Sequence, residues 1–64
     1  MALGAVITNA IFREADCSGA QFDGADATGA RFNNAGLAGA DFTAACLANA
    51  DFNGADLTDT RGIG

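Results

Sequence analysis

Alanine recurs at every fifth position of the chain, from Ala5 to Ala55, and Thr60 breaks the series. A second constrained and mostly apolar position, here called the centre, follows two residues after each alanine. The centres are Ile7, Phe12, Cys17, Phe22, Ala27, Phe32, Leu37, Phe42, Leu47, Phe52 and Leu57. A strict short period along nearly the whole chain predicts a repeat array rather than a globular domain built around a pocket.

A period of five residues fits neither an α-helix nor a continuous β-strand. On a helix, five residues advance the side chain by about 140° beyond a full turn, so the centres would scatter around the axis. On a strand, alternation would send successive centres to opposite faces. A short extended stretch followed by a corner does fit, because each alanine and its centre then share the inward face. We therefore predict an all-β solenoid with coils about 4.8 Å apart.

The two residues after each centre have the composition of a turn. They include Ser18-Gly19, Asp23-Gly24, Thr28-Gly29, Asn33-Asn34 and Asn53-Gly54. Gly and Asn tolerate positive φ, and Asp, Ser, Thr and Asn side chains can hydrogen-bond to the local backbone. These pairs predict the corners of the solenoid.

The number of sides follows from phenylalanine, which occupies every second centre and so has a period of ten residues. A three-sided coil would stack Phe on other residues. A four-sided coil stacks Phe12, Phe32 and Phe52 on one side and Phe22 and Phe42 on the opposite side, where stacked rings add packing energy. We therefore predict about three coils with four five-residue sides each, in a single domain over residues 1–64 with repeats over about 5–61.

The repeats at residues 50–54 (ADFNG) and 55–59 (ADLTD) resemble the A(D/N)LXX unit of the pentapeptide-repeat family. The resemblance covers nearly the whole chain and implies a right-handed, quadrilateral parallel β-helix. Three positions depart from the pattern. Ala27 is small for a centre, Gly36 replaces a polar residue, and Gly62 leaves the last centre without a side chain. Gly62 predicts that the solenoid ends close to it.

Charge and composition exclude several kinds of partner. The 64 residues include three Arg and no Lys, and the formal net charge is −5. Such a balance argues against direct binding to nucleic acid or to an anionic membrane. No apolar run approaches the length of a membrane span, and the N-terminal residues lack the basic region of a secretion signal. These features predict a cytoplasmic location.

The residues available for chemistry are few, because the chain has no His, Lys, Tyr or Trp. We predict no enzyme, and no catalytic residue, cofactor or metal site. Cys17 is a centre and should point inward, whereas Cys46 should point outward, so no disulfide is expected between them. The carboxylates before the centres should form charge-compensated columns at intervals of twenty residues, as in Gln21, Asp41 and Arg61.

Two outward positions of the first coil are apolar, Val6 and Ile11, where other repeats carry Asp, Gln or Arg. One interpretation is a local cap, with Met1 and Leu3 folded back over them. The other is an interface, because a short solenoid without capping helices exposes unpaired strand edges. We name Val6, Ile11 and Cys46 as candidate interface residues, and expect a homo-oligomer or a protein partner at the solenoid end.

The preferred function is therefore a non-enzymatic structural and interaction module, an acidic solenoid that self-associates. The alternative comes from the family resemblance, since some members mimic duplex DNA and bind type II topoisomerases such as gyrase. Three coils rise only about 15 Å, less than half of the ~34 Å of one DNA turn. Mimicry would therefore require end-to-end association. An enzyme is the third and weakest possibility.

Overall fold

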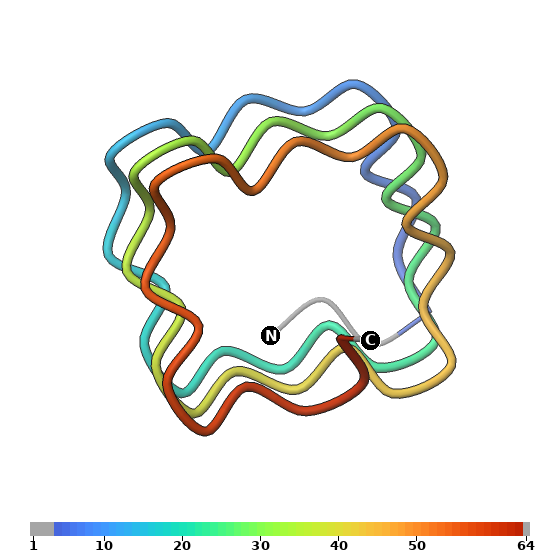
Figure 1. The fold of residues 1–64 in the computed structure, drawn as a ribbon. Helices are drawn as coiled ribbons and strands as arrows, with labels where there is room; N and C mark the ends of the chain where they lie inside the picture. Colours follow the sequence, from blue (N-terminus) through green and yellow to red (C-terminus); the bar gives the residue numbers. More distant parts are fainter. Residues whose placement is uncertain (1–3, 64) are drawn as a thin grey trace.

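The computed structural model describes residues 4–63. Its backbone is joined by parallel bridges, each one residue long, between residues twenty apart, and Figure 1 shows three superposed coils with four corners around a common interior. The bridged columns are Val6–Asp26–Cys46, Ile11–Arg31–Asp51, Asp16–Gly36–Asp56 and Gln21–Asp41–Arg61. The predicted β-solenoid is confirmed. Across residues 4–63 there is no helix, and so none that could cross a membrane.

Each side of a coil hydrogen-bonds to both neighbouring coils in a fixed way. The N–H of the centre and the N–H two residues later donate to the following coil, as in Phe32 N to Asp51 O (2.7 Å) and Asn34 N to Asn53 O (3.0 Å). The N–H just before the centre donates to the preceding coil, as in Arg31 N to Ala10 O (2.8 Å). The ladder therefore has a direction, with different groups facing each end of the solenoid.

Each corner is a tight turn closed by a hydrogen bond from the next alanine N–H to the centre carbonyl, such as Ala30 N to Ala27 O at 2.9 Å. The residue just before that alanine has positive φ in every corner from Gly4 to Asp59, the pattern of a type II turn. Glycine suits this conformation, and Asn and Asp tolerate it. Glu14 and Ala44 also have positive φ, at 62° and 61°, although they have neither the steric freedom of glycine nor the tolerance of Asn and Asp for this conformation.

Replacing Ala44 with glycine should stabilise the protein by about 1 kcal/mol, since the left-handed conformation costs an L-residue about 1–2 kcal/mol and glycine's extra chain entropy cancels only part of this. The matched control is Ala48→Gly, just before the corner residue Asn49, where φ is not positive. There the same substitution should destabilise by about 0.5–1 kcal/mol. Urea unfolding monitored by circular dichroism measures both, and equal signs for the two variants would contradict the explanation.

Corner residues twenty apart are sterically coupled. A Cβ atom built on Gly29 would lie 2.3 Å from Asn9 Oδ1, and one on Gly54 would lie 2.1 Å from Asn34 Oδ1. The asparagine side chain of one coil therefore occupies the space that a side chain on the next coil would need.

The interior is filled by the centres and alanines, most tightly in the middle coil. The fully buried core there includes Ala30, Phe32, Leu37, Ala40 and Phe42. Phenylalanine rings twenty residues apart stack as predicted: Phe12, Phe32 and Phe52 lie parallel with centroids 4.8 and 5.1 Å apart, and Phe22 stacks on Phe42 at 4.8 Å. Rings of the two columns meet edge to face, at 5.5–5.8 Å.

The outer coils bury their centres less completely. Ile7, Phe12, Cys17, Leu47 and Phe52 are half-buried against the core. The assignment of Leu57 to the buried core was wrong, because its side chain is 36% exposed. Leu57 belongs to the last coil, and no further coil in the described part of the chain covers it.

The repeat ends after Arg61, which forms the last bridge, to Asp41. Gly62 has a φ of +78°, out of step with the five-residue spacing of the corners, and a Cβ there would lie 2.5 Å from the Phe42 carbonyl carbon. Ile63 then packs against the core, and Figure 1 shows the chain turning inward at this end. The proposed cap by Met1 and Leu3 lies outside the described residues.

Candidate functional site

An apolar patch lies on the outside of the first coil. Val6 is 76% exposed and Ile11 is 71% exposed, on adjacent sides of the coil. The inward neighbours Ile7 and Phe12 are only half-buried, so apolar surface continues from the outer wall onto the end of the solenoid. We call these four residues the N-terminal patch.

Cys46, the third candidate interface residue, is exposed but does not join this patch. It belongs to the same column as Val6, but Asp26 of the middle coil lies between them. The three candidate residues therefore form an apolar patch at one end and a separate thiol near the other.

Cys46 contacts a small polar network instead. Thr28 Oγ1 lies 3.2 Å from Cys46 Sγ and 2.7 Å from Asp26 Oδ1. A hydrogen bond from Thr28, assisted by the Ala48 N–H, lowers the pKa of the Cys46 thiol, while the charge of Asp26 opposes this change. Thr28 has a single hydroxyl proton and donates to Asp26 Oδ1, whereas in its contact with Cys46 either Oγ1 or Sγ can be the donor. Burial, with the charge of Asp16, raises the pKa of Cys17, and both cysteines are free thiols.

Iodoacetamide should alkylate Cys46 faster than Cys17 at pH 7.5, because the pKa of Cys46 is lowered, the pKa of Cys17 is raised, and Cys17 is also shielded. Asp26→Asn should accelerate alkylation of Cys46 further, since it removes the opposing charge and leaves the Thr28 proton freer for the sulfur. Asp41→Asn, in another column, is the control and should not change the rate. Mass spectrometry of timed samples measures both sites, and equal rates for Cys46 and Cys17 would contradict the assignment.

The outward aspartates have a structural role that was not predicted from the sequence. In each of five repeats, Asp Oδ1 accepts a hydrogen bond from the backbone N–H two residues later, at the start of the corner. The pairs are Asp16–Ser18, Asp26–Thr28, Asp41–Thr43, Asp51–Asn53 and Asp56–Thr58, at 2.9–3.1 Å. The signal was present in the sequence, since an aspartate is followed two residues later by Ser, Thr or Asn each time.

These bonds lower the pKa of the five carboxyls. Threonine hydroxyls are the main cause at Asp26, Asp41 and Asp56, the Ser18 backbone N–H is the main cause at Asp16, and the Asn33 side chain is the main cause at Asp51. Since all five shifts are downward, the ionised forms favour the folded chain.

Stability should therefore be constant above about pH 5 and fall as the pH drops below about 4, the ordinary aspartate pKa. A depressed folded-state pKa contributes stability above the unfolded value, and this contribution is lost as the folded-state groups take up protons. Thermal melts between pH 2 and pH 7 measure the effect. Asp56→Asn should flatten the profile slightly, and a melting temperature that rises on acidification would contradict the role given to the carboxylates.

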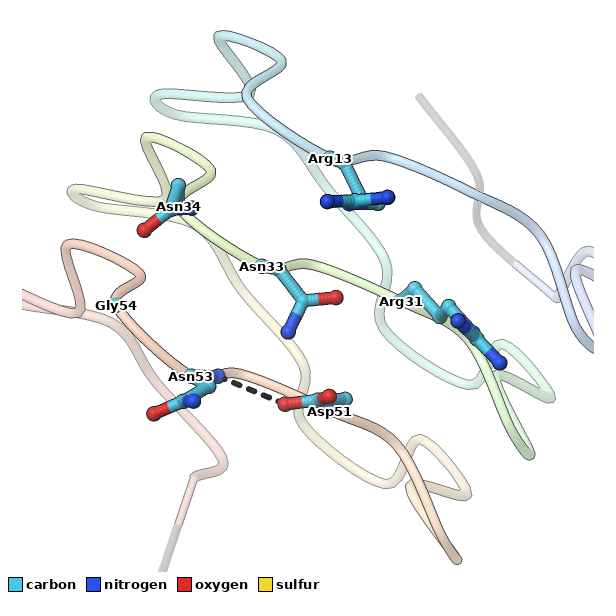
Figure 2. Close-up of a pocket in the computed structure, with 7 residues that line it drawn as sticks. All are labelled: Arg13, Arg31, Asn33, Asn34, Asp51, Asn53 and Gly54. Carbon is cyan, nitrogen blue, oxygen red and sulfur yellow. Dashed lines mark hydrogen bonds between the residues drawn. The ribbon is translucent and has the colours of Figure 1, made fainter.

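One side of the solenoid carries a shallow polar hollow of about 410 Å³, shown in Figure 2. Arg13 and Arg31 line it with Asp51, Asn33 and Asn53. Arg31 and Arg13 also help to lower the pKa of Asp51, after its hydrogen bonds. The carboxylate partly compensates the two guanidinium groups and the hollow is open to solvent, so we assign it no ligand. Arg13 was not expected at this hollow from the sequence.

Within residues 4–63, no three His, Cys, Asp or Glu side chains come together in a way that could hold a metal ion. The stacked coils, regular corners and apolar interior define a β-solenoid repeat protein. A family model described as pentapeptide repeats (8 copies) matches residues 4–35 and 35–61, and the chain belongs to this family. The search of curated proteins gave no significant match.

Proposed function

We propose that the chain is a non-enzymatic interaction module, a right-handed four-sided solenoid that self-associates through its first coil. The observation that carries the proposal is the N-terminal patch. Val6 and Ile11 lie outward at positions filled elsewhere mainly by polar and charged residues, and remain 76% and 71% exposed. Burying such surface contributes roughly 25 cal/mol per Å², and the half-buried centres beside it add to the area that a partner would cover.

Sedimentation velocity over a range of concentrations tests this proposal. The parent chain should increase in mass as concentration rises, and Val6→Asp should shift association to higher concentration by about tenfold or more, because a charge would then be buried at the contact. Asn34→Asp adds the same charge to an exposed corner of the middle coil and should associate like the parent. A parent chain that stays monomeric at millimolar concentration would exclude the proposal.

Mimicry of DNA toward a type II topoisomerase such as gyrase is the second candidate. It is favoured by the net charge of −5 and by carboxylates that face outward on every side. The Cα extents of 22 × 20 × 19 Å are shorter than the ~34 Å of one DNA turn, so mimicry would require association of several copies. A supercoiling assay decides, since absence of inhibition at high molar excess would exclude this candidate.

A further inference from the structure

We infer that the partner of the first coil is the last coil of a second copy, so that copies stack head to tail in one register. The inference rests on the proposed self-association and specifies its geometry. In this arrangement Val6 of one copy continues the column that ends at Cys46 of the other. Likewise, Ile11 follows Asp51, and Asp16 follows Asp56.

The direction of the hydrogen-bond ladder favours this arrangement. On the last coil, the N–H groups of the centres and of the corner residues find no backbone acceptor within residues 4–63; these groups belong to Leu47, Asn49, Phe52, Gly54, Leu57 and Asp59. On the first coil, the carbonyls that would receive them find no backbone donor within the same residues; these belong to Val6, Thr8, Ile11, Arg13, Asp16 and Ser18. Each donor of one end therefore has an acceptor at the same position on the other end.

The remaining groups match as well. On the first coil, the N–H groups of Val6, Ile11 and Asp16 have no backbone acceptor among the described residues. On the last coil, the carbonyls of Ala45, Ala50 and Ala55 have no backbone donor among the same residues. Between the first two coils, groups at the equivalent positions are paired, as in the bond from Asp26 N to Ala5 O. Two first coils placed edge to edge would instead bring together two carbonyl-rich edges, with two carbonyls for each N–H on each of these three sides. Unpaired buried carbonyls oppose that arrangement.

The interiors are also complementary. Phe12 and Phe52 lie at the two ends of one ring column and are both half-buried, so Phe12 of a second copy would extend the stack above Phe52 at the spacing already present. Leu47 would meet Ile7, and the exposed Leu57 would meet Cys17. The fourth side differs, because Gly62 and Ile63 close it over Phe42. The last coil of one copy can therefore pair with the first coil of the next along three sides.

One contact opposes stacking. Asp56 and Asp16 would become neighbours in a column, whereas within one chain Gly36 separates them. Asp56→Asn should therefore strengthen association, and added salt should have the same effect by screening the two charges. A head-to-tail contact that continues the solenoid axis does not close into a ring, so assembly should continue past the dimer.

A disulfide trap tests the register. In a Cys17→Ala background, Val6→Cys should form a disulfide with Cys46 of the next copy, because neighbouring residues in a column are about 4.8 Å apart, within disulfide reach. Within one chain the two residues are two coils apart, roughly 10 Å, which exceeds that reach. Oxidation with copper–phenanthroline should give a series of dimers, trimers and larger species on a non-reducing gel. Ile11→Cys, which would face Asp51 rather than Cys46, is the control and should cross-link about tenfold less.

Adding Cys46→Ser to Val6→Cys separates the possible outcomes. Loss of the cross-linked series supports head-to-tail stacking. Dimers that persist without Cys46 would show two first coils in contact, which overturns the inference but leaves self-association standing. Cross-linking no greater than that of the Ile11→Cys control also overturns the register. Sedimentation of the parent chain tests the proposed function separately, and a strict monomer would remove both. Val6 is exposed, so circular dichroism of the variant should match the parent.

Discussion

Phe32→Ala is expected to remove most of the stability of the folded chain at 25 °C. Phe32 is fully buried, stacks between Phe12 and Phe52, and meets Phe22 and Phe42 edge to face. Truncating a buried phenylalanine costs about 3–5 kcal/mol. A domain of this size has a free energy of unfolding of only about 5 kcal/mol, so the loss removes most of its stability.

Phe52→Ala is the matched control, since this ring belongs to the same column but is half-buried and has one stacked neighbour. Its cost should be about half as large, because less surface is lost and no enclosed cavity forms. Circular dichroism in urea at about 10 µM compares the variants while limiting the contribution of association. Equal losses would show that the middle coil is no more tightly packed than the last.

Ala30→Leu is expected to destabilise the chain by about 1–3 kcal/mol, the usual range when extra methylene groups are forced into a packed core. Ala30 is completely buried in the middle coil, and its column contains only alanine, with Ala10 before it and Ala50 after it. The larger side chain would push against the neighbouring ring columns or force the corner outward.

Ala10→Leu gives the comparison, because Ala10 has the same place in the first coil but is only half-buried. There the added side chain has room at the end of the solenoid, and stability should change by less than about 1 kcal/mol. If Ala30→Leu were tolerated as well as Ala10→Leu, the alanine period would not reflect a lack of space in the interior.

The sequence revealed the path of the backbone because one short period controls both side-chain direction and coil length. Phenylalanine at every tenth residue was enough to place Phe12, Phe32 and Phe52 in one stack and to pair Asp41 with Arg61. The failure at Leu57 has a simple cause. A periodic pattern assigns every centre the same environment, whereas burial also depends on how many coils lie on either side.

The polar features were harder to predict because they depend on contacts between columns. Val6 and Cys46 were grouped by their unusual character, although Asp26 separates them in space. The hollow with Arg13 required knowing that the residue after a centre projects beside the neighbouring column. The hydrogen bonds from the corners to the aspartates could have been predicted from the sequence, since they join residues only two positions apart.

The contact of Asn9 with Gly29, and of Asn34 with Gly54, bears on how such a chain can change by mutation. A side chain at Gly29 requires the Asn9 side chain to move, but meets no such contact once Asn9 is itself glycine. Substitutions at these Asn–Gly pairs, twenty residues apart, are therefore coupled, although the repeat is only five residues long. Insertion or loss of a whole coil preserves the register of every column, whereas insertion of one pentapeptide shifts all later corners onto the wrong partners. The smallest segment that can be duplicated without penalty is thus the twenty-residue coil.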